Sequence, residues 1–169
     1  MKLSVKNIAF GAIACALALV VQLIAARVPT GKLFLLCLSG VFCAIALTRG
    51  GYATALMVYV AAAGLSFLIF SPNIILPAAF ALLFGLYPVL KSLMERIRSA
   101  GRCALCKALY FALVFLLGAL LYKSLFPVNF HPLAWLGILA AYGLAALAYD
   151  LCLTKIIFLY INKLARYIK

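Results

Sequence analysis

Acidic residues are almost absent from this sequence. The chain has 169 residues but only two carboxylate side chains, Glu95 and Asp150, together with one histidine, His131. This scarcity argues against paired catalytic carboxylates, a nucleophile beside a base, or a cluster of metal ligands. The sequence also lacks a G-x-x-x-x-G-K-[ST] phosphate-binding loop. We therefore expect no catalytic residues, no metal site and no cofactor, and we expect that the protein is not an enzyme.

Charged residues of either sign are scarce as well. They make up 10% of the chain, whereas 70% of the residues are hydrophobic and the mean hydropathy is +1.27. A soluble globular domain has about a quarter charged residues, so lipid must be the solvent for most of this surface. Membrane-spanning segments satisfy their own backbone hydrogen bonds as helices. The composition predicts a single all-α integral membrane domain over residues 1–169.

Six apolar stretches predict a bundle of about six transmembrane helices, because a hydrocarbon core of about 30 Å needs roughly 20 apolar residues per helix. Segments rich in proline, glycine or charge separate the stretches. We place the spans at residues 7–26, 33–47, 52–70, 74–90, 108–126 and 133–153. A basic connector occupies residues 91–107. An amphipathic basic tail, residues 155–169, suits either the lipid interface or a cytoplasmic partner.

The distribution of basic residues predicts the orientation. The net charge is +13. With the N-terminus inside, every basic residue except Arg27, Lys32 and Lys123 falls in a cytoplasmic segment. Cytoplasmic loops of membrane proteins carry an excess of Lys and Arg, so we expect both termini in the cytoplasm. Topology and anionic lipid head groups explain the basic surplus, and we expect no nucleic-acid partner.

Asp150 is the one acidic residue inside a predicted span. It lies roughly 26 Å from the outer end of the sixth span at 1.5 Å per residue, which places it near the inner surface. Carriers driven by protons or sodium usually need ionisable or polar groups near the midplane, and no carboxylate is expected there. We interpret Asp150 as half of a structural ion pair with Lys155 or with the basic connector. A substrate or proton role is the alternative.

The six cysteines do not predict a disulfide framework. Cys15, Cys37, Cys43 and Cys152 lie within predicted spans, where cysteine behaves as a small hydrophobic residue. Cys103 and Cys106 have redox or zinc spacing. They form a single pair on the predicted reducing side, with no second ligand pair nearby, so we interpret them as structural.

Small residues recur every fourth position in the first span. Ala12 and Ala16 form one small-xxx-small pair, and Ala14 and Ala18 form another. Such pairs let helices approach closely. Packing within the bundle and contact with another subunit explain the pattern equally well.

The outer helix ends collect most of the remaining polar and aromatic side chains. A ligand site is usually a mostly apolar pocket with a few directed polar groups. An outward-opening pocket is one interpretation, and its candidate substrate-binding residues are Gln22, Lys32, Asn73, Tyr122, Asn129, His131 and Trp135. The other interpretation is that outer loops are polar in any membrane protein, with Trp and Tyr gathered at the interface.

Architecture and two sequence strings carry a family resemblance. The chain resembles the substrate-binding (S) subunits of energy-coupling factor (ECF) transporters in its small size, six predicted spans, cytoplasmic termini and alanine-rich first helix. Residues 86–96 (LYPVLKSLMER) and 149–155 (YDLCLTK) are similar to motifs of a bacterial membrane family close to those subunits. The resemblance covers essentially the whole chain.

The resemblance implies uptake of a vitamin-like or other small micronutrient across a bacterial cell (inner or plasma) membrane. In S subunits the ligand sits near the outer helix ends, under the external loops. Their alanine motifs face a transmembrane coupling protein that ATPase subunits drive. Carried over, Ala12 and Ala16 would be partner-coupling positions, and ATP hydrolysis would lie wholly in partner subunits.

A non-catalytic scaffold is the alternative from a different functional class. The membrane protein of the rod-shape morphogenesis complex has a similar size, basic loops and a comparable bundle, and residues 35–70 are compatible with it. An S subunit is expected to co-purify with ATPase and coupling subunits and to be stabilised by a small molecule. A scaffold of the cell-shape machinery is expected to bind cell-wall proteins instead.

Overall fold

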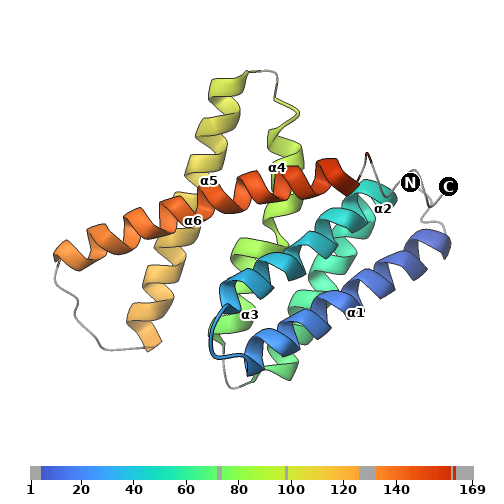
Figure 1. Ribbon diagram of the computed structural model, residues 1–169, viewed down its shortest axis with the longest axis horizontal. Helices are drawn as coiled ribbons and strands as arrows, with labels where there is room; N and C mark the ends of the chain where they lie inside the picture. The colour runs from blue at the N-terminus through green and yellow to red at the C-terminus, as the bar shows by residue number, and fades with distance from the viewer. Residues whose placement is uncertain (1–4, 72–73, 98, 126–131, 161, 163–169) are drawn as a thin grey trace. The chain divides into compact units, whose positions relative to one another are not determined.

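The structure is a computed structural model that describes residues 5–71, 74–97, 99–125, 132–160 and 162. All secondary structure in these ranges is helical: α1 (Val5–Arg27), α2 (Lys32–Ile69), α3 (Ile75–Ala79), the π-helix η1 (Phe80–Gly85), α4 (Tyr87–Met94), α5 (Ala100–Leu125) and α6 (Pro132–Leu159) (Figure 1). Five stretches are long and apolar enough to cross a membrane, namely α1, α2, the segment Ile75–Met94, and most of α5 and of α6. The all-α prediction is confirmed, and the helices indicate a multi-pass membrane protein.

The chain forms two compact units. Unit 1 comprises Met1–Ser92 and Lys155–Lys169, and unit 2 comprises Leu93–Thr154. Each unit is described by itself below.

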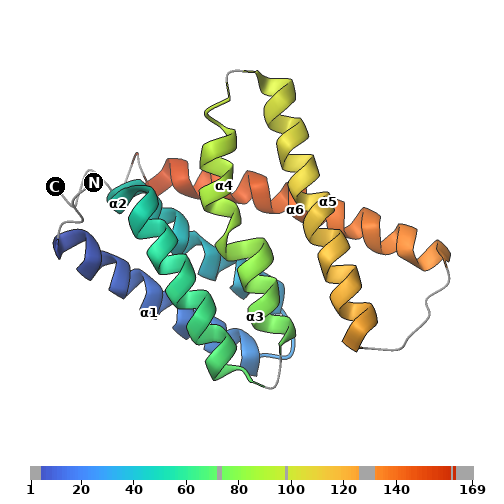
Figure 2. The same cartoon turned by 180° about the vertical axis from the view of Figure 1, so that it is seen from behind.

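In unit 1, the helix α2 is a hairpin rather than one long rod. Its two halves, residues 32–50 and 52–69, meet at Gly51, whose φ of 75° and ψ of −174° are non-helical. A straight helix would separate Ser39 from Ser66 by about 40 Å at 1.5 Å per residue, yet both side chains bond to Gln22 of α1. The chain therefore reverses at Gly51, as Figures 1 and 2 show.

Glycine explains why the reversal occurs at this position. Only a residue without a Cβ adopts such a positive φ at little cost. The reversal itself is bridged by Thr54, whose hydroxyl donates to the carbonyl oxygen of Gly50 at 2.9 Å. The sequence placed a break between its second and third spans at this Gly-Gly pair, and the structure has a break there.

Close packing of α1 against α2 forms most of the core of unit 1. One face of α1 is buried, and its members are Gly11, Ala14, Cys15, Ala18, Gln22 and Ala25. A Cβ atom added to Gly11 would lie only 3.2 Å from Thr54 and 3.3 Å from Val58. Small side chains on this face let the helix backbones approach closely.

The fourth predicted span is a helix interrupted by a π-helical segment. The segment η1 lies between Pro77 and Pro88. Pro88 has no backbone N–H, so it cannot make the usual bond to the carbonyl four residues earlier. Tyr59 of α2 donates its hydroxyl to the Ala81 carbonyl at 3.2 Å, which ties α2 to η1. The helix continues to Met94, beyond the predicted end at residue 90.

Unit 2 consists mainly of α5 and α6. The helix α5 begins at Ala100, whereas the predicted fifth span began at residue 108, so part of the basic connector is helical. Tyr142 of α6 donates its hydroxyl to the Phe111 carbonyl of α5 at 3.1 Å. Most residues of α5 are exposed.

Candidate functional site

A buried polar cluster lies between α1 and the two halves of α2. Gln22 donates its amide N–H to the Ser39 hydroxyl at 3.1 Å, and it accepts a hydrogen bond from the Ser66 hydroxyl through its amide oxygen. Ser39 in turn donates to the Ala18 carbonyl at 3.0 Å. All three polar side chains are fully buried. We call Gln22, Ser39 and Ser66 the Gln22 cluster.

The Gln22 cluster changes the interpretation of Gln22. The sequence suggested that Gln22 lines an outward-opening pocket, but its side chain is inside the helix packing with 0% exposure. The amide nitrogen and the amide oxygen of Gln22 each form a hydrogen bond with a serine of the same unit. Buried polar groups cost free energy unless they are hydrogen-bonded. In this structure Gln22 therefore joins three helical segments.

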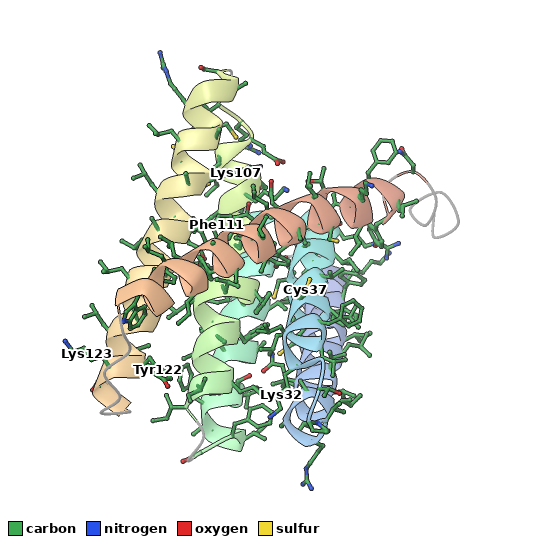
Figure 3. The ribbon with its side chains drawn as sticks, turned by 60° about the vertical axis from the view of Figure 1, so that its left-hand side comes forward. Lys32, Cys37, Lys107, Phe111, Tyr122 and Lys123 are labelled. Carbon is green, nitrogen blue, oxygen red and sulfur yellow. The ribbon has the colours of Figure 1, made fainter. Side chains whose placement is uncertain are left out.

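The other predicted pocket residues are distributed over the chain. Lys32 is exposed at the first residue of α2 in unit 1. In unit 2, Tyr122 is exposed near the end of α5, and the ring of Trp135 contacts that of Phe115 edge to face at 6.4 Å (Figure 3 labels Lys32 and Tyr122). The remaining three lie outside the described residues: Asn73, Asn129 and His131. The outward pocket stays a prediction.

Both acidic residues of the chain meet one lysine in unit 2. The Lys107 ammonium lies 3.0 Å from a Glu95 carboxylate oxygen and 3.1 Å from an Asp150 carboxylate oxygen. Lys107 and Asp150 are about four-fifths buried, whereas Glu95 is half exposed. This ion cluster connects Glu95, in the segment before α5, and Lys107 of α5 to Asp150 of α6.

The partner of Asp150 is one of the two that the sequence offered. The sequence proposed Lys155 or the connector, and in the described part of the chain the ion pair is with Lys107, the last residue of the connector, and not with Lys155. Spacing gives the physical reason, because helix neighbours are three or four residues apart and Lys155 is five beyond Asp150. The residue at the neighbouring spacing is Thr154, whose hydroxyl donates to the Asp150 carbonyl at 2.8 Å.

A groove between α5 and α6 was not foreseen from the sequence. Its volume is about 340 Å³. The α5 side consists of Ala108, Phe111, Ala112 and Phe115, and the α6 side includes Leu139, Tyr142, Gly143 and Ala146. The sequence does contain small residues four apart on α5, Ala108 and Ala112, and three apart on α6, Gly143 and Ala146. Whether such residues line a groove depends on how the two helices cross, which the sequence does not reveal.

The two alanine pairs of α1 have different environments. Ala14 and Ala18 are buried in unit 1, whereas Ala12 and Ala16 are exposed. The first pair is thus used in packing within the unit. The second pair remains accessible to lipid or to another helix.

The described cysteines are all free thiols with different exposures. Cys15 and Cys43 are buried in unit 1, and Cys37 is half-buried. Cys103 and Cys106 are half-buried near the beginning of α5, and Cys152 is exposed on α6.

Comparison of the chain with protein-family models, with curated proteins and with solved structures gives no match. A functional assignment therefore rests on the residues and contacts described above. The features available to support it are the membrane-spanning helices, the hairpin at Gly51 and the two environments of the alanine pairs.

Proposed function

We propose that this protein is a membrane-embedded substrate-binding subunit for uptake of a small micronutrient, energised by separate ATPase and coupling subunits. It crosses a bacterial cell membrane six times, with both termini in the cytoplasm. The proposal rests on the resemblance to the S subunits of ECF transporters, and several features of the fold support it.

The hairpin in α2 supports six crossings. Each half of α2, residues 32–50 and 52–69, is close to the roughly 20 residues that a crossing needs. With the hairpin counted as two crossings, α1, α2, the segment Ile75–Met94, α5 and α6 give an even number. An even number returns the C-terminus to the side of the N-terminus. This agrees with the basic residues near both chain ends and the positive-inside rule.

The exposed alanine pair on α1 is the observation that carries the proposal. Ala12 and Ala16 leave a shallow surface that a helix of a coupling protein can approach closely. Ala14 and Ala18 have similar spacing but are already buried within unit 1. One pair is therefore exposed and the other is buried in unit 1, a difference that the sequence pattern did not reveal and that supports a coupling role for the exposed pair.

The test is affinity purification of the tagged protein from its native membrane. The wild-type protein is expected to bring down a transmembrane partner and ATPase subunits, with ATP hydrolysis in the eluate. The double variant Ala12→Leu/Ala16→Leu is expected to lose both, because bulky side chains prevent close helix approach. Native mass spectrometry of the gently extracted protein would identify a bound small molecule.

A control is Ala61→Leu, which places one leucine at an exposed position of α2. This variant is expected to retain its partners. Intact assembly in Ala12→Leu/Ala16→Leu would remove the coupling face. Recovery of cell-wall proteins in place of ATPase subunits would favour the scaffold over the transporter subunit.

A further inference from the structure

The groove between α5 and α6 has the character of a site for a hydrocarbon chain. Phe111 and Phe115 provide aromatic walls, and Ala112 and Gly143 contribute little side-chain volume. The one hydroxyl in the lining belongs to Tyr142, and it donates to the Phe111 carbonyl. A polar ligand would therefore lose its hydration without a matching gain in hydrogen bonds. An apolar chain loses nothing of this kind.

The groove extends over about two turns of each helix. Its lining on α6 extends from Leu139 to Leu147, about 12 Å at 1.5 Å per residue. A volume of about 340 Å³ is at the lower end of the range for ligand sites, about 300–1,000 Å³. A stretch of one acyl chain fits this small, apolar space.

Basic residues lie toward one end of the groove. One turn beyond Ala146 on α6 is Asp150, paired with Lys107, so this end of unit 2 is polar. Arg96, in the segment before α5, and Arg102, in the first turn of α5, are both exposed. Their charge is complementary to a phosphate head group at the cytoplasmic surface, where anionic lipids attract juxtamembrane Lys and Arg.

We propose that the α5–α6 groove binds one acyl chain of an anionic phospholipid from the cytoplasmic leaflet, with its head group close to Arg96 and Arg102. This site is separate from the proposed micronutrient site and does not depend on it. Its occupant is a resident lipid that fills the space between two loosely packed helices.

Native mass spectrometry tests the proposal. The full-length protein is reconstituted in vesicles of equal amounts of phosphatidylglycerol and phosphatidylcholine and is then released into the spectrometer. We expect one retained phospholipid, with phosphatidylglycerol favoured about fivefold, the effect of about one basic residue near an anionic head group. Arg102→Gln is expected to reduce this preference.

A variant that fills the groove provides the sharper comparison. In Gly143→Leu the new side chain enters the groove, and most of the retained lipid is expected to be lost. Gly137→Leu is the matched control, because it adds the same side chain at a residue outside the groove lining. A Cβ at either glycine meets no atom within 4 Å, so both variants are expected to fold.

A fluorescence measurement keeps the test decisive if binding does not survive in the spectrometer. In the reporter Trp135→Phe/Phe111→Trp the single tryptophan lies in the groove lining. Phosphatidylglycerol with brominated acyl chains is expected to quench it, and Gly143→Leu is expected to reduce the quenching. Equal lipid retention and quenching in Gly143→Leu and Gly137→Leu would overturn the proposal. So would the mass of a second protein in place of a lipid.

Discussion

Coupling between Gln22 and Ser66 offers a quantitative test of the hairpin. Gln22→Met keeps the length of the side chain but removes its amide group, and Ser66→Ala removes the hydroxyl that donates to the Gln22 amide oxygen. The two residues lie on α1 and on the second half of α2. A direct bond between them exists only if the chain reverses at Gly51.

The expected coupling energy follows from the bonds involved. Double-mutant cycles in membrane proteins give about 0.6 kcal/mol on average for an interhelical hydrogen bond, with a maximum near 1.7 kcal/mol. The Gln22–Ser66 bond is fully buried, so we expect about 1 kcal/mol. When Gln22 is replaced, the Ser66 hydroxyl can instead bond to the backbone carbonyl four residues earlier in its own helix. This alternative bond keeps the coupling energy below the maximum.

Two buried thiols provide the assay. Cys15 and Cys43 lie in unit 1, and replacing Cys37, Cys103, Cys106 and Cys152 with serine leaves only these two. Unfolding of unit 1 exposes both to a thiol-reactive fluorophore. Labelling during titration with dodecyl sulfate then yields the free energy of unfolding for each variant.

A control cycle decides the interpretation. Thr54 is also a buried hydroxyl residue in the second half of α2, but its hydroxyl bonds to the Gly50 carbonyl across the break at Gly51 and not to Gln22. Gln22→Met combined with Thr54→Val is expected to be additive within about 0.3–0.5 kcal/mol. The reasoning fails if the Ser66 coupling is no larger than the Thr54 coupling.

Other variants test the turn and the ion cluster. Gly51→Ala should destabilise unit 1 by about 1–3 kcal/mol, because a residue with a Cβ is strained at that φ and ψ. Its control, Gly64→Ala within the helical part of α2, should be neutral or stabilising by up to about 1 kcal/mol. The same thiol assay measures both. Asp150→Asn should destabilise unit 2 by about 1 kcal/mol through loss of the ion pair with Lys107. The fluorescence of the single tryptophan measures this unfolding. Lys155→Gln should change this stability by less than about 0.5 kcal/mol, and an equal effect of the two changes would restore Lys155 as the partner.

Composition and breaker residues predicted much of the fold. Apolar stretches of membrane-spanning length indicated helices, and the Gly50–Gly51 pair indicated a break. These signals are local, because span length and glycine conformation depend on few neighbours. Helix ends were less accurate, since α4 and α5 extend into the basic connector at Met94 and Ala100. Polar residues near a membrane surface are compatible with helix, so hydropathy alone does not locate a helix end.

The candidate site was harder to predict because it depends on which helix faces meet. Gln22 looked like a pocket residue from its position near an outer end, but the crossing of α1 with the α2 hairpin places it in the core. The partner of Asp150 was narrowed to two choices, and helix spacing alone would have excluded Lys155. The environments of Ala12 and Ala14 are also indistinguishable in the sequence pattern, because both belong to small-xxx-small pairs.

Cysteine accessibility in intact cells tests the membrane topology most directly. In a cysteine-free background, single cysteines are introduced at Thr30, Thr48, Ser71 and Ser99, all exposed residues outside the proposed crossings or at their ends. An impermeant thiol reagent is expected to label positions 30 and 71 from outside, and positions 48 and 99 only after permeabilisation. Labelling of positions 30 and 71 from opposite sides would contradict the hairpin, the six crossings and the functions proposed from them.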